Sequence, residues 1–355
     1  MIPWKWLRSW EAVLAAALVV ELLVLGAINP AFLSVENLLY STSDFAHVIL
    51  GALGLTLVVI TAGIDISGVS IMGLASIVLG LSWVAGADIW VAVLIALAVG
   101  SMAGAFNGLL VANTDVNPLV LTLGSMFMFA GIATGLPGVL DLLGFKAYGA
   151  GGFAAYQYEG ITGLPKEFTA LAHGGIGWVP NPLIAVLLFA LALSVILHRT
   201  RFGRYLYLIG VNPNVARYSG VPVKSVIVAV YMLSAFGAAM AGVILTSYFT
   251  SARSDLGSEA LLNIITAVVL GGTDILGGSG TVLGTLLAGL VLGFLRQGLL
   301  ALGVSNDVIP IIVGGLLIGT VAVKLGLIAF NQRRGNRRAY QLEISETREG
   351  GGSAT

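Results

Sequence analysis

Residues 198–224 read HRTRFGRYLYLIGVNPNVARYSGVPVK, a long polar interruption in a chain that is otherwise almost continuously apolar. The stretch carries five basic residues and no Asp or Glu. The basic residues are Arg199, Arg201, Arg204, Arg217 and Lys224. In a membrane protein, a short connection this basic stays in the cytoplasm. Residues 199–224 therefore predict a cytoplasmic loop, and this loop fixes the direction of every membrane span.

Within this loop, residues 212–220 predict a short helix. Asn212 and Pro213 begin it, Gly220 closes it, and Pro222 prevents its continuation. Such a helix, lying along the membrane, suits docking into a groove on a soluble partner. The alternative is a basic loop held only by anionic lipid. Lipid attraction explains the arginines but not the capped helix, so the pattern favours docking.

The composition indicates a helical membrane protein. Apolar residues make up 57% of the chain and charged residues 10%, against about 25% charged in a soluble domain. The mean hydropathy is +0.99. The 48 glycines suit close helix packing in lipid, and the apolar runs are continuous rather than alternating, which favours helices over a barrel. Cysteine is absent, which excludes disulfides and thiolate metal sites.

Ten apolar runs are long enough to suggest membrane spans, which require about 20 residues each. They cover about 11–28, 45–61, 69–86, 89–111, 118–136, 182–198, 225–247, 259–273, 281–301 and 308–329. Ten spans that start inside put both ends of the chain and the basic loop in the cytoplasm. Of the 17 basic residues, 13 then lie inside, as the positive-inside rule requires. Those left outside or near an outer helix end are Lys146, Lys166, Arg253 and Arg296.

The chain therefore divides into a transmembrane domain, 1–330, and a charged and then Gly/Ser-rich tail, 331–355, that we expect to be cytoplasmic and disordered. Residues 137–181 are rich in Gly, Pro and aromatic residues and contain both signs of charge. They predict an external loop. The expected location is a membrane, crossed several times.

The segment TAGIDISGVS, residues 61–70, interrupts the apolar pattern. Its glycines weaken a helix, and Asp65 places a carboxylate at or near membrane depth. Irregular backbone is tolerated there only against protein or a water-filled cavity, and an ionisable group in a span suggests function. The alternative is a cytoplasmic turn in which Asp65 caps the next helix. The sequence gives these two interpretations equal weight.

The segment LGGTDILGGSG, residues 270–280, echoes the first at an offset of 209, so that Asp274 corresponds to Asp65. Paired interruptions in two halves of a transporter point to the translocation path. The span count makes the two segments parallel. Glycine-rich chains also match by chance, so the repeat is suggestive only.

Several hydroxyl and amide residues lie in or next to apolar runs. They are Asn107, Asn117, Thr122, Ser125, Thr266 and Gln297. Such groups could line a path for a neutral polyhydroxyl solute, and we place Asp65, Ser67, Asn107, Asn117, Thr122 and Asp274 on it. For any single residue, ordinary hydrogen bonding between helices is favoured about two to one.

The chain lacks the residues of an enzyme. It has no G-x-x-x-x-G-K-[ST] motif, no Ser/His/Asp set, and three scattered histidines without metal-ligand spacing. We expect no cofactor and no nucleic-acid partner. An ion-coupled secondary transporter for a small polar solute is the alternative function, with Asp65 and Asp274 as ion ligands. A membrane enzyme or scaffold has only the loop 137–181 in its favour.

Over about residues 10–328 the chain resembles the permease subunits of bacterial ABC importers for monosaccharides, the family of the ribose, rhamnose and autoinducer-2 permeases. The matching pieces are NPAFLSVENL (29–38), GIDIS (63–67), NGLLV (107–111), LTLG (121–124), TRFGRY (200–205), ARYSGV (216–221) and AVVLGGT (267–273). One departure is the order Ser-Gly-Val-Ser at 67–70, where the family usually has Ser-Val-Gly-Ser. The rhamnose and autoinducer-2 branches look nearest.

The resemblance implies an ABC importer assembly. Two permease subunits, identical or a related pair, would enclose one pathway in the lipid bilayer of the bacterial inner membrane. Cytoplasmic ATPase subunits would hydrolyse ATP, and a periplasmic solute-binding protein would deliver a monosaccharide or sugar-like solute. By the same likeness, the short helix would be the coupling helix that the ATPases grip. Its coupling residues would be Asn212, Asn214, Ala216, Arg217, Tyr218, Ser219 and Gly220.

Overall fold

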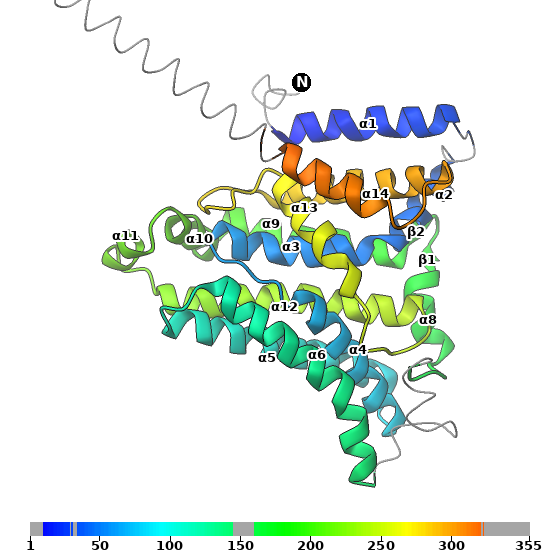
Figure 1. Cartoon of the computed structure of the whole chain (residues 1–355), viewed down its shortest axis with the longest axis horizontal. Helices are drawn as coiled ribbons and strands as arrows, with labels where there is room; N and C mark the ends of the chain where they lie inside the picture. Colours follow the sequence, from blue (N-terminus) through cyan, green and yellow to red (C-terminus); the bar gives the residue numbers. More distant parts are fainter. Residues whose placement is uncertain (1–9, 29, 31–33, 145–159, 321, 323–355) are drawn as a thin grey trace, which may run out of the picture.

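The computed structural model describes residues 10–28, 30, 34–144, 160–320 and 322, and most of these residues are helical (Figure 1). The first part contains α1 (Trp10–Ile28), α2 (Val35–Ser41), η3 (Thr42–Asp44), α3 (Ala46–Ile60), α4 (Gly68–Val84), α5 (Ile89–Asn113) and α6 (Pro118–Leu142). Then follow α8 (Lys166–His173), the hairpin β1 (Gly175–Ile176) and β2 (Val179–Pro180), α9 (Asn181–Arg199), α10 (Arg201–Val211) and α11 (Pro213–Tyr218). The last are α12 (Val223–Tyr248), η4 (Ser258–Ala260), α13 (Leu261–Leu270), α14 (Val282–Ala301) and a helix at Ile309–Thr320.

The predicted all-α membrane bundle is confirmed. Among the described residues, six helices (α1, α5, α6, α9, α12 and α14) are long and apolar enough to cross a membrane alone. A seventh span is possible if α2–η3 and α3, which meet at a bend of 62°, count as one. Three further apolar helices, Gly68–Val84, Ser258–Leu270 and Ile309–Thr320, are shorter. Each of the ten predicted runs thus has a helix, but ten is an approximate span number because not every helix crosses by itself.

Hydrogen bonds show which segments share an end of the bundle. Trp10 Nε1, at the start of α1, donates to Leu270 O at the end of α13 (2.7 Å). Gly278 N donates to Ile60 O at the end of α3 (2.9 Å). Tyr207 OH of α10 donates to Gly280 O (2.8 Å). The start of α1 and the basic loop therefore lie at one end, which we call the α11 end.

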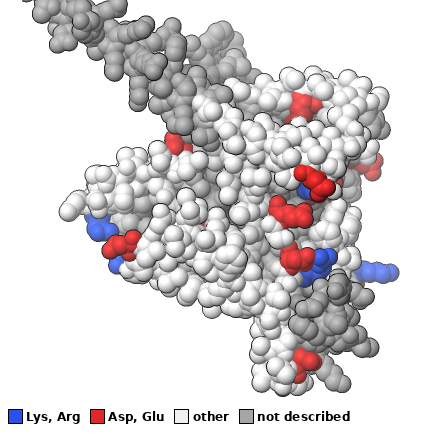
Figure 2. Space-filling view, in the orientation of Figure 1, with Lys and Arg blue, Asp and Glu red and all other residues white. Residues whose placement is uncertain are grey.

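At the opposite end, which we call the α8 end, Tyr248 OH of α12 donates to Asp44 Oδ1 (2.8 Å). Figure 2 shows a broad uncharged band between the charges at the tip that carries α11 and those on the opposite side. Large apolar side chains on the outer helices, such as Leu94 and Phe127, are more than 60% exposed. A band of this kind suits contact with lipid tails.

The core is built by close helix packing around α12. Gly104 of α5 lies so close to α12 that a Cβ there would be 2.3 Å from Ala235 Cβ and 2.4 Å from Tyr231 O. Small residues let helix backbones approach in this way, which is a common source of helix association in lipid. Against this core, α3 and α4 pack almost completely buried.

The connections differ in part from the predicted loops. Within the predicted external loop 137–181, α6 continues through Pro137 to Leu142, and α8 with the β1–β2 hairpin forms a small folded cap near α12. Proline is tolerated inside a helix of this kind because neighbouring groups satisfy the freed carbonyl. Residues 145–159 of that loop and the predicted tail, 331–355, lie outside the described residues.

Candidate functional site

The short helix predicted in the basic loop is present as α11, and its ends are fixed locally. Asn212 Oδ1 accepts hydrogen bonds from Asn214 N (3.0 Å) and Val215 N (3.1 Å). Gly220 then adopts a φ of +80°, and Val221 N donates back to Ala216 O (3.1 Å). A side-chain cap at the start and a left-handed glycine at the end are the usual limits of a short helix.

Six of the seven predicted coupling residues are exposed, namely Asn212, Asn214, Arg217, Tyr218, Ser219 and Gly220. The seventh, Ala216, is buried and anchors the helix to the bundle. Tyr218 is 92% exposed, and Val211 and Val215 beside it are also exposed. In Figure 1, α11 projects from the bundle. An exposed aromatic with two exposed valines on a rigid, projecting helix suits contact with another protein.

The helix α10 connects α11 to the two glycine-rich interruptions. A Cβ on Gly210 would lie 1.9 Å from Ile60 O and 2.4 Å from Gly278 N. Gly277 packs in the same way against Ala62, whose φ is +61°. The interruptions at 61–70 and 270–280 are therefore in direct contact, and both follow helices that run toward the α11 end. We call the contact of Gly210, Ile60 and Gly278 the glycine seam.

The first interruption is folded into the bundle. Asp65 Oδ1 accepts from Ser67 N (3.0 Å) and Ser67 Oγ (2.6 Å), and Asn107 Nδ2 donates to Ser67 Oγ (2.7 Å). Thr122 Oγ1 donates to Ile64 O (3.3 Å). Asp65, Ser67, Asn107 and Thr122 are all buried. Four of the six residues that the sequence places on the path thus come together, from the interruption, α5 and α6.

This cluster combines features of both interpretations of the sequence. Asp65 accepts a hydrogen bond from Ser67 N just before α4, as a capping residue would. It is buried within the bundle, however, and not in a solvated turn. Two buried acceptors, Asp65 Oδ2 and Asn107 Oδ1, have no hydrogen-bond partner among the described residues. Asp65 also borders a void of about 20 Å³, which is enough for one water molecule.

The other two residues lie elsewhere. Asn117 is exposed and caps α6 by accepting from Leu119 N (2.9 Å). Asp274 lies in the 271–281 connection, where its Oδ1 accepts from Leu276 N (3.0 Å). The structure does not bring either of them to the Asp65 cluster. Each of these two side chains accepts a hydrogen bond from a backbone N–H two residues further on, so each stabilises a local turn or helix start.

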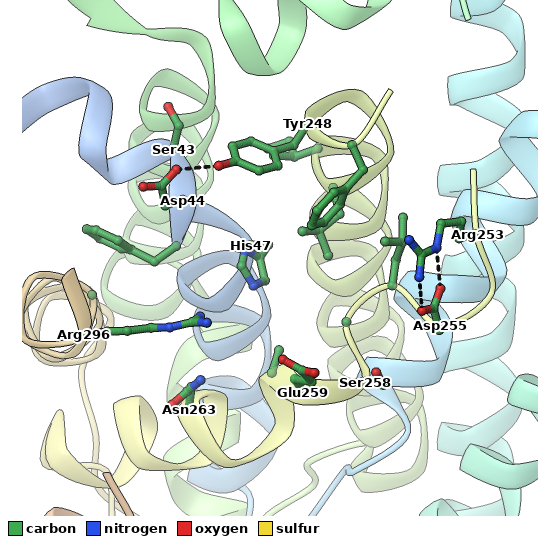
Figure 3. A pocket seen from close by; sticks show the side chains of 18 of the residues that line it. Ser43, Asp44, His47, Tyr248, Arg253, Asp255, Ser258, Glu259, Asn263 and Arg296 are labelled. Atoms are coloured by element: carbon green, nitrogen blue, oxygen red, sulfur yellow. Dashed lines mark hydrogen bonds and ion pairs between the residues drawn. The ribbon is translucent and has the colours of Figure 1, made fainter. Parts of the chain in front are cut away.

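A larger cavity, of about 560 Å³, opens near the α8 end between α3, α12, α13 and α14 (Figure 3). Charged and polar groups from four separate segments reach it, including Asp44, His47, Arg253, Glu259 and Arg296. Sequence reasoning did not assemble this site because its residues occupy helix ends far apart in the chain. The available signal in the sequence was Arg253 and Arg296, two of the four basic residues that the predicted spans leave outside or near an outer helix end.

Within the described part of the chain, no group of three or more His, Asp or Glu could hold a metal ion.

Comparison with known proteins agrees with this architecture. A protein-family profile described as the permease component of a branched-chain amino acid transport system matches residues 37–321. The Autoinducer 2 import system permease protein LsrD of Klebsiella pneumoniae is 44% identical over 88% of this chain and 90% of its own length. The proteins of the same name from Escherichia coli K12 and Salmonella paratyphi A are 45% and 44% identical, over 88% and 90% of this chain and 91% and 92% of their own lengths.

No solved structure matches the chain. The family match covers most of the described helices, and the relatives are transport components rather than enzymes. The chain therefore belongs to the family of transport-system permease components that includes the autoinducer 2 import permeases.

Proposed function

We propose that this chain is the permease subunit of an ATP-driven importer for autoinducer 2 or a related sugar-like solute. The observation that carries the proposal is α11, a capped helix that projects from one end of the bundle and is joined through α10 to the interrupted helices. A membrane subunit without a nucleotide-binding motif needs such a contact if a separate ATPase is to move it. The ends of the chain and α11 then face the cytoplasm.

The partners follow from the same proposal. Cytoplasmic ATPase subunits dock on α11, a second permease subunit completes the pathway, and a periplasmic solute-binding protein delivers the solute to the α8 end. The permease contributes two conformations whose affinities for these partners differ. Residues 1–330 act as one membrane domain, and the location we propose for residues 331–355 is the cytoplasm.

The glycine seam supports the route by which movement passes from the ATPases to the spans. Two segments whose backbones are in direct contact move together, because no side chain lies between them that could change its rotamer and absorb the displacement. A displacement of α11 therefore moves α10, and α10 moves the ends of α3 and of the 271–281 connection.

One observation favours the second candidate function, an ion-coupled carrier. Asp65 places a carboxylate inside the bundle with one oxygen unpartnered among the described residues. The two functions differ in their energy source. In membrane vesicles that contain the whole importer, ATP-driven uptake that continues after the proton and sodium gradients are collapsed supports the ABC permease. Uptake that stops at constant ATP supports the carrier.

Substituting Tyr218 by Asp is expected to uncouple the ATPases. Tyr218 is 92% exposed at the tip of α11, so the change leaves the bundle intact but removes an aromatic anchor, and such anchors contribute about 2 kcal/mol or more to binding. We expect about a 30-fold loss of ATPase affinity and a matching loss of uptake. Co-purification of the ATPase and uptake in vesicles measure these two effects.

The matched control is Trp178→Asp, which changes an aromatic that is 70% exposed in the turn between β1 and β2, at the α8 end. This variant should keep full affinity for the ATPase. Equal losses in the two variants, or none in Tyr218→Asp, would contradict the assignment of α11 as the docking helix.

A further inference from the structure

One wall of the cavity at the α8 end is the segment that joins α12 to α13. After α12 ends at Tyr248, the chain turns through Thr250, whose φ is +53°, and passes to η4 before α13 begins. The first turn of α3 and the last turns of α14 form the other walls. A volume of about 560 Å³ falls in the range of small-molecule sites.

Part of the polar lining is already paired within the protein. Asp44 accepts hydrogen bonds from Tyr248 OH and from Gln297 Nε2, both at 2.8 Å. Arg253 forms an ion pair with Asp255. These pairs use two of the three carboxylates and one of the two guanidinium groups that line the cavity.

The remaining groups have no such partner. Among the described residues, Arg296, Glu259 and Asn263 make no side-chain hydrogen bond or ion pair, although all three line the cavity. Figure 3 shows Arg296 and Asn263 on the same side as Glu259, with Asp44 and Tyr248 across from them. Two further polar atoms at the cavity, Ser43 Oγ and Gln297 Oε1, are buried without a partner in the described chain, and Ser43 is only 8% exposed.

These free groups specify the chemistry of a ligand. Arg296 can only donate, whereas the Glu259 carboxylate and Gln297 Oε1 can only accept. The Ser43 hydroxyl and the Asn263 amide can do both. A hydroxyl group both donates and accepts, so several hydroxyls on one small ring can satisfy donors and acceptors together. The hydrogen bonds to Asp44 come from neutral groups, so the charges left without an ionic partner are two negative, Asp44 and Glu259, and one positive, Arg296. This mixture disfavours an anionic solute and suits one that binds through several hydroxyls. A ligand without hydrogen-bond donors would leave buried acceptors unpaired.

We propose that this cavity is a binding chamber for a small, neutral, polyhydroxylated solute, and that Arg296, Glu259 and Asn263 hold its hydroxyls. The inference rests on the proposed function, because it names the place where the transported solute first contacts the membrane subunit. A zwitterionic amino acid, whose carboxylate would pair with Arg296 and whose ammonium would pair with Glu259, is the competing ligand.

Solute protection of a single cysteine tests the chamber directly, since the natural chain has no cysteine. Ser258 lines the cavity but is not one of the three proposed ligand residues, so Ser258→Cys reports occupancy without removing a contact. The whole importer is reconstituted, and a membrane-impermeant thiol reagent is applied with autoinducer 2, ribose or leucine. The control is Glu167→Cys on the exposed side of α8, outside the cavity.

We expect autoinducer 2 or ribose to slow the labelling of Ser258→Cys by about tenfold at saturation, as site occupancy requires. Leucine should have no effect, and labelling of Glu167→Cys should not change with any solute. Protection by leucine alone, or no protection by any of the three solutes, would overturn the proposal. Labelling does not need ATP, so it can succeed or fail independently of ATP-driven uptake, which tests the proposed function.

A second measurement separates contact with solute from a structural role. Arg296→Gln and Glu259→Gln should each raise the solute concentration for half-maximal uptake by about tenfold or more, the usual effect of losing a hydrogen bond to a charged group. The maximal rate should change little. Glu36→Gln, at an exposed position of α2, should change neither value. A fall in the maximal rate alone in the two cavity variants would count against direct binding.

Discussion

Gly210→Ala is expected to abolish uptake while the chain still inserts into the membrane. The added Cβ would lie 1.9 Å from Ile60 O and 2.4 Å from Gly278 N. Both neighbours are backbone atoms, so no side chain can rotate away, and overpacking of this kind costs about 1–3 kcal/mol or more. The glycine seam should open, which separates α10 from α3. We expect uptake below about a tenth of the wild-type rate, because a cost in the upper part of this range, about 2–3 kcal/mol, corresponds to a factor of about 30–150.

The matched control is Gly124→Ala, which adds the same methyl group to α6 at a position where no atom lies within 4 Å of the new Cβ. It should leave uptake and thermal stability unchanged, or raise the stability slightly, because alanine favours a helix more than glycine does. Normal uptake in Gly210→Ala would show that the seam does not transmit the movement of α11.

Asp65→Leu is expected to destabilise the bundle and to stop uptake. It removes the acceptor of the two hydrogen bonds from Ser67 N and Ser67 Oγ. Both donors would remain buried without a partner, at a cost of about 2–4 kcal/mol in the free energy of unfolding. Thermal unfolding in detergent, monitored as the folded fraction against temperature, measures the change in the free energy of unfolding.

Asp65→Asn separates the hydrogen bonds from the charge. Its amide oxygen can still accept from Ser67, so stability should stay within about 1 kcal/mol of the natural chain and uptake within about threefold. If Asp65→Asn folded normally but transported nothing, the carboxylate itself would be required. That result would favour the ion-coupled carrier over the ATP-driven permease.

Local chemistry explains why much of the fold was predictable. The limits of α11 depend on Asn212, Pro213 and Gly220, which act on backbone groups one to three residues away. The apolar runs became helices because lipid leaves the backbone no other partner. The main length error was α6, where Pro137 marked an end in the sequence but lies inside the helix.

The sites depend on contacts that no local pattern contains. Asp65 meets Asn107 and Thr122 only after three segments have packed together, and Asn117 and Asp274 looked equivalent to them in the sequence. The glycine seam joins Gly210 to residues 60 and 278, and a Gly in an apolar helix does not reveal what it faces. The cavity needs helix ends from four segments, so Glu259 and Asn263 carried no recognisable motif.

The central claim is that a cytoplasmic ATPase binds α11, and site-specific crosslinking tests this claim most directly. Val215→Cys introduces one thiol on the exposed side of α11, in a chain that has no other cysteine. In membranes that contain the whole importer, a short bifunctional thiol reagent should link Val215→Cys to the ATPase subunit, and Trp178→Cys at the α8 end should form no such link. A crosslink to the ATPase from Trp178→Cys, with none from Val215→Cys, would contradict the account.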